Sequence, residues 1–280
     1  MSVKIVVDSG ADLEKDYVDK VVVVPLTVTF GGVEYIDGVT ITHKEFYEKL
    51  IESDELPTTS QATPMAFEEV FKEGKKAGDE LVVLTLSSKL SGTYQSAMIA
   101  AADYDNVYVV DTNSVAIGMG VLAKLAIGYM EEGLDAKTIA AKLEEDKKRV
   151  CLIAMLDTLE YLKKGGRISA AAAFAGGVLS IKPVICVREG VVEMLGKARG
   201  SKQGNNLLIK EIENAGGVDY SKPILLGYTG LSDHLLNKYI EDSESLWKDR
   251  VDELQTTTIG SVIGTHVGPG AIAVAFMSNM

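Results

Sequence analysis

The sequence has few of the residues and motifs that usually carry enzyme chemistry. It contains only two cysteines and three histidines among 280 residues. It has no glycine-rich phosphate loop ending in Gly-Lys-Ser/Thr, no His-Glu-x-x-His, no Cys-x-x-Cys and no Gly-x-Ser-x-Gly. These absences argue against a nucleotide-binding enzyme, a zinc or dithiol site and an ordinary serine hydrolase. We therefore expect neither a metal ion nor a cofactor.

Positive charge and long hydrophobic runs are also scarce. The formal net charge is −12, which disfavours binding to nucleic acid or to acidic membrane surfaces. No uninterrupted apolar run approaches the ~20 residues of a membrane span, and Lys4 and Asp8 interrupt the first apolar residues. We therefore expect no integral membrane protein and no signal peptide. Cys151 and Cys186 lie in apolar segments, as is typical of buried thiols in a reducing compartment, so the sequence predicts a cytoplasmic protein.

Strand-like and helix-like segments alternate through the first half of the chain. Such alternation is typical of βαβ units and a mostly parallel sheet. Thr63 before Pro64 predicts the start of one helix. The predicted strands cover residues 3–7, 21–30, 81–86 and 107–110, and the predicted helices cover residues 44–53, 65–76, 91–102, 114–130 and 135–149.

The pattern changes near residue 150. Arg188-Glu189-Gly190 predicts a hairpin between two strands, which indicates some antiparallel pairing. We therefore predict an α/β protein with two domains, a three-layer sandwich with a mostly parallel sheet over residues 1–150 and a mixed-sheet α/β domain over residues 151–280. The predicted strands of the second half cover residues 152–156, 183–187, 191–195 and 224–228 and two closing strands, and its predicted helices cover residues 159–164, 168–180, 203–214 and 233–248.

Two hydroxyl-rich segments, residues 57–64 and 86–96, each precede a predicted helix. Hydroxyls and backbone N–H groups at such a position can hold an anion without a metal ion. The second segment also follows a strand, where ligands bind in parallel sheets. Helix capping is the alternative role for Ser91 and for Thr63, and it leaves Thr59 and Ser60 without a structural duty. Gly92 allows close backbone approach.

The three histidines differ in their surroundings. His43 and His234 fall in polar segments at predicted helix starts, so we expect both to face solvent. His266 instead lies in a glycine-rich segment that we predict to be a loop between two apolar strands. Such a histidine is either structural or functional, and its hydroxyl-bearing neighbour Thr265 favours a function.

Six segments resemble the motifs of the DegV family and occur in the same order. They include Thr-Ser-Gln-x-Thr-Pro, Leu-Ser-Ser-x-Leu-Ser-Gly-Thr-Tyr and Thr-His-Val-Gly-Pro-Gly. The family often has Ser after a Gln-Pro or Gln-x-Pro step, where this chain has Gln61-Ala62-Thr63-Pro64, and this departure leaves Thr59 and Ser60 in place. The resemblance covers nearly the whole chain, at residues 8–13, 59–64, 86–94, 110–112, 161–169 and 265–270.

The resemblance implies a two-domain protein with a ligand tunnel between or beside the domains. The ligand would be a long-chain fatty acid, which this chain, as a non-catalytic subunit, would present to a separate ATP-binding kinase subunit. That kinase would convert the carboxylate into an acyl phosphate, a step of phospholipid metabolism, and Arg167 would face it. The implied ligand-binding residues are Thr59, Ser60, Ser91, Gly92, Thr93, Thr265 and His266.

Two other functions stay open at this point. The first is a lipid carrier or sensor without chemistry. The second is a stand-alone hydrolase or transferase in which Ser91 and His266 act with Asp111 or Asp8. The alanine-rich stretch of residues 170–175 either lines a tunnel for an acyl chain or serves tight helix packing.

Overall fold

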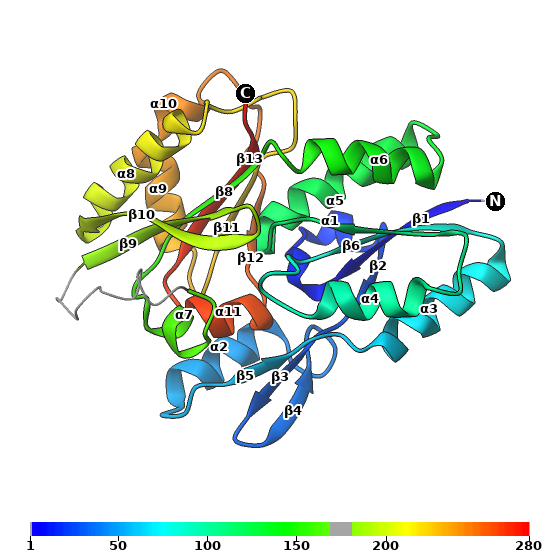
Figure 1. Ribbon diagram of the computed structural model, residues 1–280. Coiled ribbons are helices and arrows are strands. Elements are labelled where there is room, and N and C mark those ends of the chain that lie inside the picture. Colours follow the sequence, from blue (N-terminus) through cyan, green and yellow to red (C-terminus); the bar gives the residue numbers. More distant parts are fainter. Residues whose placement is uncertain (1, 169–180, 280) are drawn as a thin grey trace.

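The structure is a computed structural model that describes residues 2–168 and 181–279 (Figure 1). Its first sheet has the order β2-β1-β6-β7, and every neighbouring pair is parallel, as predicted. The strand order reverses direction between β1 and β6, and ligands bind near such a point at the carboxyl edge of a parallel sheet. The four strands are β1 (Val3–Asp8), β2 (Val21–Val24), β6 (Glu80–Thr85) and β7 (Val107–Asp111).

Helices cover both faces of this sheet, which gives the three-layer arrangement predicted for the first half. Helices α3 and α4 pack together on one face, and α5 and α6 pack together on the other (Figure 1). The predicted cap of α3 is confirmed, since Thr63 Oγ1 accepts a hydrogen bond from Ala66 N at 3.2 Å. The helices are η1 (Ser9–Ala11), α1 (Lys15–Val18), α3 (Pro64–Ala77), α4 (Thr93–Ala101), α5 (Ala116–Glu131) and α6 (Ala136–Asp146).

The prediction of one strand over residues 21–30 was wrong, because part of this segment belongs to a small antiparallel sheet. That segment forms β2 and then β3 (Thr27–Phe30), which belong to different sheets. Pro25 separates them because it has no N–H group to donate, and Leu26 N donates instead to Ser9 Oγ at 3.1 Å. The other strands of the small sheet are β4 (Val33–Ile36) and β5 (Thr58–Ser60), and helix α2 (His43–Glu52) lies between these two strands in the chain.

The second sheet is mixed, as predicted, with the order β10-β9-β8-β13-β11-β12. Among the described strands of this sheet, only β11 and β12 pair in parallel. The predicted hairpin is confirmed, and its two turn residues, Glu189 and Gly190, both have positive φ angles, as a tight hairpin turn requires. The strands are β8 (Val150–Met155), β9 (Ile181–Arg188), β10 (Val191–Arg199), β11 (Leu225–Tyr228), β12 (Thr256–Thr258) and β13 (Ile272–Met277).

The helices of the second half depart from the prediction in two places. The segment 233–248 forms two helices that meet at Ser243, whose buried hydroxyl donates to Tyr239 O at 2.6 Å and accepts from Trp247 Nε1 at 2.8 Å. A helix also lies between the closing strands, where a loop was expected. The helices are α7 (Glu160–Lys164), α8 (Gly200–Asn214), α9 (His234–Asp242), α10 (Glu244–Trp247) and α11 (Ser261–Val267).

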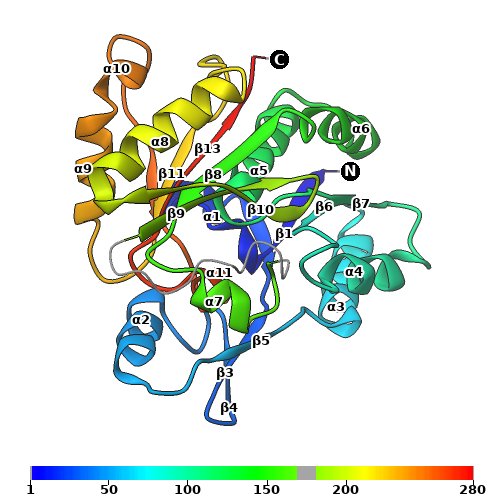
Figure 2. The ribbon, with the colours of Figure 1, turned by 60° about the vertical axis from the view of Figure 1, so that its left-hand side comes forward.

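Helix α5 connects the two sheets, because it packs against β1 and β6 of the first and against β8, β11 and β13 of the second (Figure 2). The main hydrophobic core accordingly includes strand residues from both. The division at residue 150 stays a prediction. Apart from Ile168, the helix predicted over residues 168–180, with its alanine-rich stretch of residues 170–175, lies outside the described residues. Within the described ranges, no helix has the length and apolar character that crossing a membrane requires.

Candidate functional site

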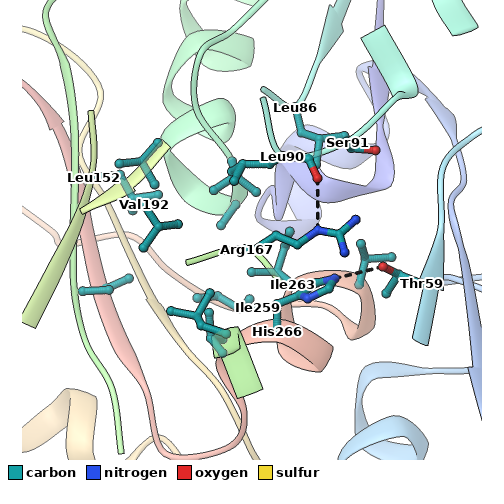
Figure 3. Close-up of a pocket in the computed structure, with 18 of the residues that line it drawn as sticks. Thr59, Leu86, Leu90, Ser91, Leu152, Arg167, Val192, Ile259, Ile263 and His266 are labelled. Carbon is teal, nitrogen blue, oxygen red and sulfur yellow. Dashed lines mark hydrogen bonds between the residues drawn. The ribbon is translucent and has the colours of Figure 1, made fainter. Parts of the chain in front are cut away.

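An apolar cavity of about 340 Å³ lies where the two sheets and α11 meet. Its walls come from the β6–α4 loop, the start of α5, strands β8 and β9, and α11. Polar side chains gather at one end, where Thr59, Ser91, Arg167 and His266 lie near one another, whereas Leu152 lies in the apolar part (Figure 3). The apolar wall includes Leu26, Leu86, Leu90, Val115, Leu152, Ile185, Val192, Ile259 and Ile263. Such a cavity suits a long apolar molecule with one polar head.

The loop after β6 is held in place by neighbours on several sides. Leu86 N donates to the buried carboxylate of Asp8 at 2.7 Å, across the point where the strand order reverses. Ser87 Oγ donates to the carbonyl oxygen of Gly190, at the tip of the β9–β10 hairpin, at 2.7 Å. Ser88 N lies 3.2 and 3.3 Å from the carboxylate oxygens of Asp111. The loop therefore presents its next residues to the cavity from a fixed backbone.

Ser91 lies at the end of this loop and lines the cavity. Helix α4 begins at Thr93 with Gly92 as its N-cap, so the predicted capping position of Ser91 was wrong by one residue. The Ser91 hydroxyl still accepts from Thr93 N at 3.3 Å and lies 2.9 Å from Thr93 Oγ1. Ser91 thus holds the start of the helix and also has access to the cavity.

His266 lies in the last turn of α11, which corrects the prediction of a loop. The glycines that suggested a loop instead allow close packing, because a Cβ on Gly264 would lie 2.6 Å from the Tyr47 hydroxyl and 2.7 Å from the Phe46 ring of α2. The helix points His266 at β5, and its Nε2 atom lies 2.9 Å from Thr59 Oγ1 (Figure 3). Tertiary packing thus joins two predicted site residues that are 207 positions apart.

The surroundings of the His266 ring determine its charge and its tautomer. Burial, and secondarily the nearby charge of Arg167, lowers the pKa of His266 to about 4, so the ring is neutral at pH 7. Its Nδ1 atom is buried without a hydrogen-bond partner among the described residues and abuts Gly165, where a Cβ would lie 2.2 Å away. Because a buried N–H without an acceptor is costly, we assign the hydrogen to Nε2. The Thr59 hydroxyl then accepts from His266 and keeps its own hydrogen for another acceptor.

Arg167 is exposed at the polar end of the cavity. Its Nε atom donates to Leu90 O at 3.2 Å and its Nη1 atom to Gly165 O at 2.6 Å. The guanidinium group therefore spans the Ser91 loop and the turn after α7. Its Nη2 atom has no hydrogen bond among the described residues, so it can contact a ligand or a partner protein.

The predicted ligand-binding residues divide into two groups. Five of them line the cavity together, namely Thr59, Ser60, Ser91, Gly92 and His266. Thr93 and Thr265 are buried, and neither is among the described residues that line the cavity. The Thr93 hydroxyl bonds to the Ser91 hydroxyl, and the Thr265 hydroxyl donates to Ser261 O. The role of all seven residues in binding stays a prediction.

Gln61 was not predicted as a site residue, although it lies in the first hydroxyl-rich segment and lines the cavity. Its neighbours Thr59 and Ser60 were selected because neither was needed to cap a helix. Gln61 was missed because its side chain contacts the start of α4, which is distant in sequence.

The other two histidines lie outside the cavity lining. His234 is exposed, and His43 is half-buried at the start of α2.

A serine hydrolase arrangement is not assembled among the described residues. The ring of His266 bonds to Thr59 and not to Ser91, and no acid orients its Nδ1 atom. Asp8 and Asp111, the two candidate acids, accept hydrogen bonds from backbone N–H groups. Residues 2–168 and 181–279 contain no group of three or more acidic, histidine or cysteine side chains placed to hold a metal ion.

The chain is similar to proteins of known structure. The model of the DegV family, described as uncharacterised proteins, matches residues 2–279. A DegV domain-containing protein of Caldanaerobacter subterraneus is 34% identical over 280 residues, 98% of each chain. A fatty-acid-binding DegV family protein of Thermus thermophilus is 34% identical with a TM-score of 0.88, covering 99% of this chain and 100% of that one. A DegV lipid-binding protein of Thermotoga maritima is 30% identical with a TM-score of 0.86, covering 98% of both chains.

Proposed function

The chain belongs to the DegV family, and from that premise we propose that it binds a long-chain fatty acid. The acyl chain would occupy the apolar cavity, and the carboxylate would lie between the hydroxyls of Thr59 and Ser91. The observation that carries this proposal is a cavity with apolar walls whose described polar side chains, the hydroxyls of Thr59 and Ser91 among them, gather at one end. Relatives of the same fold that bind fatty acid or lipid add support.

The energetics of binding favour such a ligand. Each buried CH₂ group contributes about 0.8 kcal/mol, so a long acyl chain supplies most of the affinity. The assigned tautomer of His266 leaves the hydroxyl hydrogen of Thr59 available to the carboxylate. Hydroxyl donors hold a carboxylate less firmly than a two-pronged arginine contact does, so an oxygen that accepts one hydroxyl still has a lone pair with which to react. Arg167 has already committed two of its nitrogen atoms to backbone carbonyls.

The reactive oxygen suggests a chemical step after binding. The chain would present the carboxylate to a separate ATP-dependent kinase subunit, which would form an acyl phosphate, with the exposed Arg167 facing that subunit. The sequence supports this division of labour because it contains no recognisable nucleotide loop. The alternative is a lipid carrier or sensor in a cytoplasmic setting, without chemistry of its own.

Two measurements test the proposal. Lipid extracted from the purified protein should contain a fatty acid, detected by mass spectrometry, and added fatty acid should raise the Tm of delipidated protein. With ATP and magnesium alone, the chain should form no acyl phosphate; the addition of a kinase subunit should produce it. Absence of both an extracted acyl chain and a thermal shift contradicts fatty acid binding. Binding without any kinase-dependent turnover supports the carrier or sensor.

A further inference from the structure

Gln61 connects the two hydroxyl-bearing segments of the site. Its Nε2 atom donates to Ser96 Oγ at 2.8 Å and to Gly92 O at 3.3 Å, both in or next to the first turn of α4. Among the described residues, these are the only hydrogen bonds between residues 58–63, which carry Thr59, and residues 87–96, which carry Ser91.

The absence of a side chain at Gly92 leaves room for the Gln61 side chain. A Cβ at Gly92 would lie 2.0 Å from Gln61 Oε1 and 2.7 Å from its Cδ atom. The backbone of Gly92 does not itself require glycine, because its φ of −77° and ψ of 3° are open to any residue. A side chain at this position would instead have to displace the Gln61 amide.

The two hydroxyl segments belong to separate parts of the fold. Thr59 lies on β5, which among the described strands pairs only with β3 of the small sheet, whereas Ser91 follows β6 of the parallel sheet. A carboxylate has two acceptor oxygens on one carbon, so it benefits from two donors only when their spacing is fixed. A fatty alcohol has a single hydroxyl and needs only one such partner.

From these contacts we infer that Gln61 is a positioning residue that sets the spacing between the Thr59 and Ser91 hydroxyls and so makes the site select a carboxylate head over a neutral one. This inference rests on the proposed function, because it specifies the head group that the lipid site recognises. Gln61 acts through the two hydroxyl segments and need not contact the ligand.

The test measures the affinities of delipidated protein for hexadecanoic acid and for hexadecan-1-ol, together with Tm. Gln61→Ala should weaken binding of the acid roughly 10-fold, the effect of losing one well-placed hydrogen bond to a charged group, and should leave binding of the alcohol within about 2-fold. Gln61 is exposed, so its Tm should change by no more than about 3 °C. Gln95→Ala is the matched control, an exposed glutamine on α4 without a side-chain hydrogen bond among the described residues.

A double-mutant cycle isolates the contact. Gly92→Ala should displace the Gln61 amide and reproduce the loss of acid selectivity, and Gln61→Ala combined with Gly92→Ala should be no worse than either single change. If wild-type protein binds neither lipid, the proposed function fails before Gln61 is tested. If wild-type protein prefers the acid and Gln61→Ala keeps that preference, the inference is wrong. Equal weakening of acid and alcohol in parallel with Tm also overturns it, because Gln61 would then only support the fold.

Discussion

Buried ionisable groups lie at both ends of α11, but they differ in how many hydrogen bonds the protein gives them. At its N-terminal end, Gly260 N donates to Asp12 Oδ1 at 2.7 Å and Ser261 Oγ donates to Asp37 Oδ1. At its C-terminal end, the His266 side chain makes one hydrogen bond among the described residues, to Thr59, and lines the cavity. The acidic end is thus held by donors of the protein itself, whereas the histidine end stays open to a ligand.

Burial acts on both ends in the same physical way, because it disfavours the charged form of each group. It raises the pKa of Asp12 well above its usual range and the pKa of nearby Asp8 to about 7. It lowers the pKa of His266 to about 4. The difference lies in compensation: the carboxylates receive backbone N–H groups from Gly260 and Leu86, which tie segments together. The acidic end is therefore held by hydrogen bonds within the fold, whereas the histidine end lines the cavity.

The largest expected effect lies at the acidic end. Asp12→Ala leaves the Gly260 N–H group buried without an acceptor, which costs about 1–3 kcal/mol, and places alanine at a φ of 43°, which costs about 1–2 kcal/mol more. Asp12→Asn keeps an acceptor and tolerates that backbone, so it should cost far less. Urea unfolding of the two variants measures the difference. Equal stabilities would break the comparison, since Asp12 would then not hold α11.

At the histidine end, the expected effect is on turnover. His266→Ala should retain bound fatty acid and lower kinase-coupled turnover per bound lipid by ~10²-fold, the loss typical of one electrostatic contact at a reacting group. His234→Ala, which removes an exposed histidine, should leave turnover unchanged. The opposite pattern, with Tm and lipid occupancy falling together at constant turnover per bound lipid, would mean that His266 only ties α11 to β5.

Ser91 combines the properties of the two ends of α11, because it both supports a helix start and lines the cavity. Ser91→Ala should weaken fatty acid binding by roughly 10- to 100-fold, since it removes a donor to a charged group. Its effect on the free energy of unfolding should be about 1 kcal/mol or less. Ser88→Ala, on the exposed part of the same loop, serves as control. A stability loss with unchanged lipid affinity would leave Ser91 a structural residue.

The smallest expected effect is a change in pH dependence. Between pH ~4 and ~6.5 the unfolded state protonates His266 while the native state does not, so this residue makes stability rise with pH. Asp8, with its raised pKa of about 7, acts in the opposite direction between pH ~4 and ~7, because the native state then binds the extra proton.

Removal of the histidine separates these two opposing contributions. His266→Gln should therefore make stability fall more steeply as pH rises through this window than in wild-type protein. Unfolding free energies at several pH values, compared between the two proteins, measure this change. Identical pH profiles would show that the His266 ring titrates normally in the folded protein.

Local sequence features predicted most of the regular structure. The Thr63-Pro64 start of α3 and the Glu189-Gly190 turn were correct because the signals are contained within a few residues. The glycine-rich segment around His266 was misjudged, because Gly264 reflects close packing against α2, which no local pattern reveals. The break after β2 was missed for a related reason, since the continuous apolar run outweighed the single Pro25.

The sequence by itself determined the α/β class, the mixed second sheet and, through its motifs, the family. Those features depend on residue periodicity, turn chemistry and short segments that are read along the chain. Only the tertiary structure decided that Thr59, Ser91, Arg167 and His266 share one end of an apolar cavity, and that Gln61 joins two of their segments. The physical reason is that these groups come from a strand, two loops and a helix that are far apart in sequence. Their distances are therefore set by how the sheets pack around α5 and α11, and by no local preference of the chain.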